Sequence, residues 1–122
     1  VYGYVVDGEI VHQRAWGTGD DTVFRIASMT KSFTALAILK LRDEGKLSLD
    51  DPASKYVPEL AKMTLPTKDA PAITVRHLLT HGAGFPEDNP WGDRQLDVAD
   101  AKLGEWLKAG VPFSTPPGTA YE

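Results

Sequence analysis

The sequence has no cysteine among its 122 residues. Disulfide bridges, thiolate metal sites and cysteine nucleophiles are therefore excluded. No apolar run approaches the roughly 20 residues that a membrane-spanning helix needs, so no membrane span is expected. There is also no basic excess, because 17 acidic residues outnumber 13 Lys and Arg and give a net charge of −4. A nucleic-acid partner is disfavoured, since phosphate binding calls for a basic face.

Recognisable terminal signals are missing too. The chain opens in a β-like run at Val1, without methionine or a signal-like segment, and closes on turn residues from Pro116 to Glu122. We interpret both ends as cuts. The sequence does not decide between a periplasmic or secreted location and a cytoplasmic one. The remaining composition, 42% hydrophobic and 25% charged, is that of one ordinary globular domain.

Strand signals come first along the chain, and helix signals follow. β-rich runs flank Asp7-Gly8, a dipeptide that tolerates positive φ at both turn centres, which predicts a hairpin over residues 4–17. A short strand is expected over 23–26. Helices are expected over 28–44 before Gly45, from Pro52 (capped by Asp51) to before Pro58, from the cap Thr74 to Gly82, and from about 96 to Gly110. Strands followed by helices indicate an α+β or mixed α/β fold.

The 28–44 helix carries a pair of residues able to do chemistry. Ser28 and Lys31 stand three residues apart, hence on one helical face. Serine becomes a nucleophile when a base removes its proton, and lysine can be that base only when neutral, a state that costs on the order of 4 kcal/mol at pH 7. The helix is apolar on most of its circumference, which is typical of a buried helix, and apolar walls and a helix N-terminus both disfavour the ammonium. The same terminus directs the Ser28 N–H toward an oxyanion.

The Ser-x-x-Lys spacing also has an ordinary interpretation, because it arises by chance in roughly half of chains this long. In that interpretation Ser28 only caps the helix and Lys31 is a surface lysine. The position of the pair, where a strand leads into a buried helix, favours catalysis.

Two other groupings have better structural explanations. His77 and His81 have the i, i+4 spacing of a two-histidine metal site, but no H-E-x-x-H glutamate or third ligand accompanies them, so no metal is expected. Asp50 and Asp51 are neighbours that cannot share a helical face, and a cap before Pro52 explains them.

Aromatic residues are candidates for the wall of a substrate cleft. Trp106 fits the apolar stripe of the last predicted helix and is assigned to the core. Trp91 and Phe113 lie in predicted loops, so we expect them to contact substrate.

Three segments, in this order, carry a family resemblance: "DTVFRIASMTKSFTALAILKLRDEGKLSLDDPASKYVPEL", "ITVRHLLTHGAGF" and "PPGTAYE". The chain resembles the serine β-lactamase and penicillin-binding protein superfamily, closest to class C β-lactamases and their esterase, D-aminopeptidase and D-alanyl-D-alanine carboxypeptidase relatives. The resemblance implies that Ser28 is the acylated nucleophile and Lys31 the general base. No cofactor is implied.

The resemblance also implies an architecture. It is an antiparallel sheet with packed helices plus a helical lobe, of the β-lactamase/transpeptidase type. Residues 1–27 would supply the first strands, 28–45 the buried nucleophile helix, and 46–122 part of the helical lobe, in which "HLLTHGAGF" is scaffold.

Two further family motifs are not in the sequence. The Tyr-x-Asn motif should follow "PPGTxYE", and Tyr121 stands too early to be its tyrosine; the Lys-Thr-Gly or His-x-Gly strand is missing as well. We therefore expect the C-terminal part of the domain to be absent and the fold to be completed by a second polypeptide or a longer chain. The chain alone should be inactive.

The expected activity of the completed fold is hydrolysis, through an acyl-enzyme, of a small ester, a D-amino-acid amide or peptide, or a β-lactam. The alternative is a non-catalytic penicillin-binding-like module that captures a ligand or serves as structure.

Overall fold

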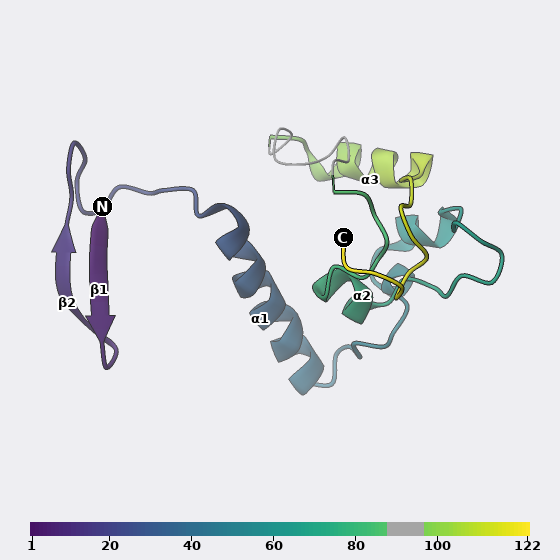
Figure 1. Cartoon of the computed structure of the whole chain (residues 1–122), viewed down its shortest axis with the longest axis horizontal. Coiled ribbons are helices and arrows are strands. Elements are labelled where there is room, and N and C mark those ends of the chain that lie inside the picture. The colour runs from purple at the N-terminus through teal and green to yellow at the C-terminus, as the bar shows by residue number, and fades with distance from the viewer. Residues whose placement is uncertain (88–96) are drawn as a thin grey trace. The chain divides into compact units, whose positions relative to one another are not determined.

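A computed structural model describes residues 1–87 and 97–122. Strands precede helices, as expected for a mixed α+β chain. The elements are β1 (Tyr2–Val6), β2 (Glu9–Arg14), α1 (Thr30–Asp43), α2 (Val75–Leu79) and α3 (Asp100–Ala109), with 3-10 turns at Ala27–Met29, Ala53–Lys55 and Pro58–Lys62 (Figure 1). The chain divides into two compact units, Val1–Thr34 and Ala35–Glu122. The domain boundaries expected after residues 27 and 45 stay predictions.

β1 and β2 form the predicted hairpin. The strands pair antiparallel, with Val6 opposite Glu9, and a register shift after Tyr4 marks a bulge. The turn is Asp7-Gly8, with φ of +50° and +82°, the positive values that this dipeptide accepts. Within the described residues the sheet has these two strands.

Aromatic contacts join the two strands of the hairpin. The rings of Tyr4 and His12 stack at 5.4 Å between centroids, and Tyr2 stacks on Trp16 at 6.1 Å. The guanidinium of Arg14 lies 4.8 Å from the centre of the Trp16 ring. Cross-strand contacts of this kind stabilise a two-stranded sheet by about 0.2–1 kcal/mol each.

The strand expected over residues 23–26 is wrong. Among the described residues no strand pairs with this segment, and Val23 is 95% exposed. A β-rich sequence forms a strand only when a neighbour accepts its backbone hydrogen bonds. The segment is therefore part of an irregular connection between β2 and α1.

Helix α1 starts two residues after the predicted Ser28, because Ala27–Met29 form a 3-10 turn. Its end matches the prediction. Gly45 has a φ of +70°, and the Lys46 and Gly45 N–H groups donate to the carbonyls of Leu41 and Arg42, both at 2.9 Å. This is the Schellman arrangement that ends many helices.

The burial expected for α1 stays a prediction. None of its residues is buried, and Phe33 and Leu36 are each 65% exposed. A helix that is apolar all round is typical of one that packs against neighbours on several faces. Among residues 1–87 and 97–122, no helix has both the length and the apolarity to cross a bilayer.

Asp51 joins several hydrogen bonds at the start of the helical unit. Its carboxylate accepts from the Ser48 N–H at 3.0 Å, from Lys55 Nζ at 2.9 Å, and from the Tyr56 hydroxyl. These bonds, Tyr56 foremost and then Lys55, lower the pKa of Asp51 to about 2. Asp51 therefore stabilises this loop rather than capping a helix, and the short helix expected from Pro52 is a single 3-10 turn.

Asp50 has a different partner. It accepts from Arg76 Nε at 2.8 Å and from the second guanidinium nitrogen at 3.2 Å, and this contact lowers the pKa of Asp50. The two neighbouring carboxylates thus accept hydrogen bonds from different side chains and form no catalytic pair. This agrees with the structural role that the sequence predicted for them.

Thr74 caps α2 as predicted. Its hydroxyl accepts from the His77 N–H at 3.2 Å, while the Thr74 N–H donates to His77 Nδ1 at 3.2 Å. This is a capping box with histidine in place of the usual Glu or Gln. His77 is therefore structural, as expected, and the described residues contain no group of three or more His, Asp or Glu able to hold a metal. The helix ends at Leu79, before the predicted Gly82, because His81 adopts a φ of +56°.

The core of the second unit is small. Ala53, Ile73 and Ala83 are buried together, and three larger side chains, Leu60, Phe85 and Phe113, pack against them. Helix α3 packs against the Pro58–Lys62 turn, which the sequence did not predict, and ends at the expected Gly110 with a φ of +98°. Half-buried Trp106 agrees with its assignment to the apolar side of α3.

Residues 114–122, called the strap below, are bound to the turn that follows α2. The carbonyls of His81, Gly82 and Gly84 accept from the N–H groups of Glu122 at 3.0 Å, Gly118 at 2.8 Å and Ser114 at 2.8 Å. Gly84 has a φ of +81°, and a Cβ there would lie 2.1 Å from the Thr115 carbonyl oxygen. The turn and the strap thus meet backbone to backbone.

Gly84→Ala should lower the free energy of unfolding by roughly 2–4 kcal/mol, because the methyl group meets the strap and the left-handed φ is strained. Gly45→Ala is the matched control, since Gly45 has a similar φ of +70° with no atom within 4 Å of the added Cβ. It should lose only about 1 kcal/mol. Chemical denaturation measures both, and equal losses would contradict the strap contact.

Stability should also depend on pH through Asp51. The pKa of Asp51 in the folded chain is about 2, below its ordinary value of 3.8. Ionised Asp51 therefore stabilises the fold fully at a pH above 3.8, and this stabilisation is lost as the pH falls toward 2. The difference in Tm between wild type and Asp51→Asn should therefore be large at pH 6 and shrink between pH 4 and pH 2. Parallel curves for wild type and Asp51→Asn would refute this role.

Candidate active site

The candidate site lies where the chain enters α1. The Met29 N–H donates to the Ile26 carbonyl at 3.1 Å and closes a turn around Ala27 and Ser28. Ala27 has a φ of +47°, an uncommon value for alanine. Ser28 therefore stands on a tight turn, and Lys31 follows in the first turn of α1.

Ser28 and Lys31 are in contact, as their spacing predicts. Lys31 Nζ donates a hydrogen bond to Ser28 Oγ at 2.9 Å. This distance lies inside the range over which a base can take a proton directly. A neutral Lys31 amine would accept the Ser28 proton along the same line.

The surroundings of the pair bear on the charge of the lysine. Among the described residues no carboxylate lies within ion-pair distance of Lys31. Ser28 and Lys31 are both exposed in this chain, and neighbouring Met29 is 63% exposed. Within the unit Val1–Thr34 no residue is buried, so this unit by itself does not supply the apolar walls expected around the lysine.

The two aromatic candidates are placed differently. Trp91 lies outside the described residues. Phe113 packs on Phe85 with 5.3 Å between ring centroids and borders the small core of the second unit. Its contacts are those of a core residue, and a contact with substrate stays a prediction.

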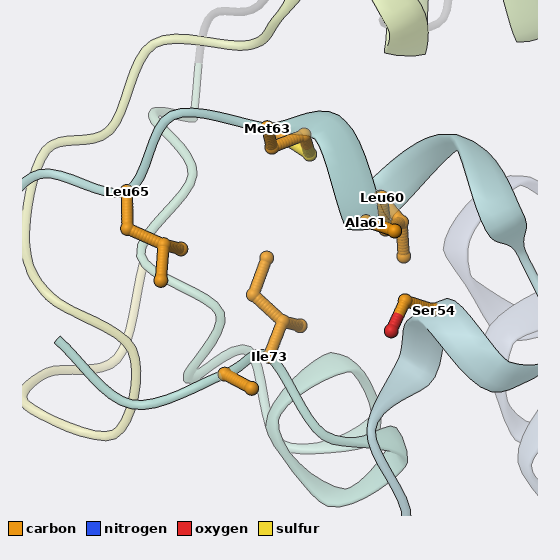
Figure 2. A pocket seen from close by; sticks show the side chains of 7 residues that line it. Ser54, Leu60, Ala61, Met63, Leu65 and Ile73 are labelled. Atoms are coloured by element: carbon orange, nitrogen blue, oxygen red, sulfur yellow. The ribbon is translucent and has the colours of Figure 1, made fainter.

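A cavity of about 220 Å³ lies beside that core. Figure 2 shows its lining, which is apolar apart from the hydroxyl of Ser54; the other lining residues are Leu60, Ala61, Met63, Leu65, Ala72 and Ile73. It contains neither Ser28 nor Lys31, and no ionisable group accompanies Ser54. The cavity therefore offers apolar contact and no nucleophile with a base.

Comparison with known proteins identifies the family of this chain. A family model described as Beta-lactamase matches residues 1–122. The chain belongs to the beta-lactamase family. The family resemblance inferred from the sequence is thereby confirmed for an N-terminal portion, and the small antiparallel sheet with helices is consistent with the family's fold.

Several curated relatives share this part of the beta-lactamase family. Esterase EstB of Burkholderia gladioli is 36% identical over 94% of this chain and 34% of its own length. The D-alanyl-D-alanine-carboxypeptidase/endopeptidase AmpH of Escherichia coli is 43% identical over 59% of this chain and 18% of its own length. Protein flp of Staphylococcus aureus is 48% identical over 75% of this chain and 20% of its own length. The chain thus spans about a third of the esterase and about a fifth of the other two.

The relatives support a hydrolase of the beta-lactamase family. One feature of this family member escaped the sequence analysis, namely the left-handed conformation of Ala27. Glycine, asparagine and aspartate are the residues that routinely adopt such a conformation, and "FRIASMTK" contains none of them.

Proposed function

We propose that this chain carries the nucleophile and the general base of a serine hydrolase that works through an acyl-enzyme. Ser28 is the nucleophile, its own N–H is an oxyanion donor, and Lys31 is the base. The 2.9 Å hydrogen bond between Lys31 Nζ and Ser28 Oγ is the observation that carries the proposal. The substrates proposed are a carboxylic ester, a D-amino-acid amide or peptide, or a β-lactam, in keeping with relatives named as an esterase and a carboxypeptidase.

The proposed reaction has two halves. Neutral Lys31 takes the hydroxyl proton as Ser28 Oγ bonds to the substrate carbonyl carbon, and the carbonyl oxygen becomes an oxyanion near the Ser28 N–H. The tetrahedral intermediate expels an alcohol or amine, which takes the proton from Lys31. Water then attacks the acyl-enzyme, passes a proton to Lys31, and releases the acid as Ser28 recovers its hydrogen.

We also propose that the site works only when further polypeptide covers it, either a second chain or a continuation of this one. The exposure of Ser28, Lys31 and the apolar side chains of α1 supports this, because an amine in water stays charged at neutral pH. The partial coverage of the relatives is consistent with it.

Covalent labelling tests the proposal. The complete protein, incubated with a fluorophosphonate or with labelled penicillin, should gain the mass of the probe on Ser28, located by peptide mass spectrometry. Ser28→Ala should gain no probe mass, while it should still bind the product of substrate hydrolysis non-covalently. Folded wild-type protein that forms no adduct with either probe would instead favour the non-catalytic ligand-binding module.

Replacing Lys31 by arginine tests whether Lys31 acts as a base or only as a positive charge. Lys31→Arg keeps the charge and the donor groups, but guanidinium does not lose its proton in proteins. The labelling rate of Ser28 should fall by about 10²–10⁴-fold. Lys40→Arg, an exposed change in the last turns of the same helix, should label like wild type. Unchanged labelling of Lys31→Arg would exclude lysine as the base.

The chain by itself should be a poor catalyst. Because the described residues leave the Ser28–Lys31 pair open to solvent, the isolated chain should hydrolyse p-nitrophenyl esters no faster than its Ser28→Ala variant. Steady-state absorbance assays on both proteins measure this. An ordinary enzymatic rate for the isolated chain would overturn the need for completion.

A further inference from the structure

His77 links the start of α2 to the strap. Its Nδ1 accepts the Thr74 N–H at 3.2 Å, in the capping box that begins the helix. The other edge of the ring faces Gly118, where an added Cβ would lie 3.2 Å from His77 Nε2. The His77 carbonyl accepts the Gly82 N–H at 2.8 Å, and the Gly82 carbonyl accepts the Gly118 N–H at 2.8 Å. His77 is thus linked to the strap on two sides, through its ring and, by way of Gly82, through its backbone.

The hydrogen bond from Thr74 requires a neutral imidazole. A neutral ring has one nitrogen that accepts and one that donates, and Nδ1 is the acceptor here, so the proton lies on Nε2. Glutamate and glutamine, the usual residues at this position of a capping box, accept such a bond throughout the range from pH 5 to pH 8. Histidine is the side chain that ordinarily gains a proton within that range. At position 77, histidine therefore makes the cap depend on a proton where the usual residues would not.

A protonated His77 would disturb both the cap and the strap. Imidazolium donates from both nitrogens, so its Nδ1–H would point at the Thr74 N–H, and the cap would lose its acceptor. The ring relieves this opposition by rotating away from Thr74. Its other edge moves at the same time, and Gly118 leaves that edge little room. The strap must therefore shift when the ring rotates.

Ionisable groups on three sides could influence the charge of His77. The titratable and charged side chains of the elements around it are Arg76 on α2, His81 on the turn after α2, Asp50 and Asp51 on the loop before α2, and Tyr121 and Glu122 on the strap. Asp50 is paired with Arg76 at 2.8 Å, so these two charges offset one another. Among the described residues no carboxylate forms an ion pair with His77. The contact that a change of charge breaks is thus the hydrogen bond from Thr74.

We propose that His77 is a pH switch, whose neutral imidazole maintains the start of α2 and the seating of the strap, and whose protonation loosens both. The fold binds the neutral form, so the stabilisation is present above the range in which histidine titrates and is lost as the pH falls through it. The switch acts on the helical unit and does not depend on the activity proposed for Ser28.

Hydrogen exchange in the complete protein tests the switch. Wild type and His77→Gln are compared at the same pH by peptide mass spectrometry, so the intrinsic effect of pH on exchange cancels. At pH 8 the two proteins should exchange alike over residues 74–77 and 114–122. At pH 5.5 wild type should exchange about threefold to tenfold faster than His77→Gln in both segments, the effect of losing a helix cap.

A matched control and a second measurement accompany this comparison. His12→Gln makes the same change on the hairpin, in the other unit, and should exchange like wild type at both pH values. The Tm of wild type should also fall below that of His77→Gln by about 2–4 °C at pH 5.5, and match it at pH 8.

Two results would overturn the switch. Equal exchange of wild type and His77→Gln at pH 5.5 would show that protonation of His77 changes neither segment. Faster exchange at residues 74–77 with an unchanged strap would refute the link between them. His77→Glu, with the other usual capping-box side chain, replaces His77→Gln if that variant does not fold. If neither folds, exchange in wild type, corrected for its intrinsic rate, must rise in both segments together between pH 7 and pH 5.5, and a flat profile refutes the switch.

Discussion

The hydrogen bond between Lys31 and Ser28 is the interaction on which the interpretation of this chain depends. A serine beside a neutral amine has access to a base, and a serine without one is an ordinary alcohol. The bond is local in sequence, so three residues of turn and one turn of helix suffice to form it. What the local sequence does not provide is a dry environment, since the side chains around the pair are exposed in this chain. Geometry and desolvation are thus separable requirements, and residues 1–87 and 97–122 meet the first.

The features predicted well from the sequence are those that neighbouring residues determine. Asp7-Gly8 fixed the hairpin, Gly45 and Gly110 fixed the ends of α1 and α3, and Thr74 fixed the start of α2. Each of these depends on the φ preference of one residue or on a hydrogen bond three residues away. The Ser28–Lys31 contact belongs to the same class, because helical spacing alone brings the two side chains together.

The prediction that failed and the one that stays untested both depend on partners distant in sequence. Residues 23–26 have the composition of a strand, yet a strand exists only where another strand pairs with it. The apolar surface of α1 indicates burial, but burial depends on what packs against the helix. Ala27 is a different case, because its left-handed conformation is imposed by the turn around it and not by any preference of alanine. Partners distant in sequence decide the first two cases, and composition does not encode such partners.

The strap has a consequence for when this chain can fold during synthesis. Helix α2 has five residues, far below the length at which an isolated helix persists in water, and its turn is bonded to residues 114–122. On the ribosome, α2 emerges about 35 residues before the first of those partners does. The hairpin, whose contacts are close in sequence, can form as soon as it leaves the exit tunnel. The helical unit must instead wait for its last residues, so a pause in translation before Ser114 would leave Ile73, Ala83 and Phe85 open to chaperones.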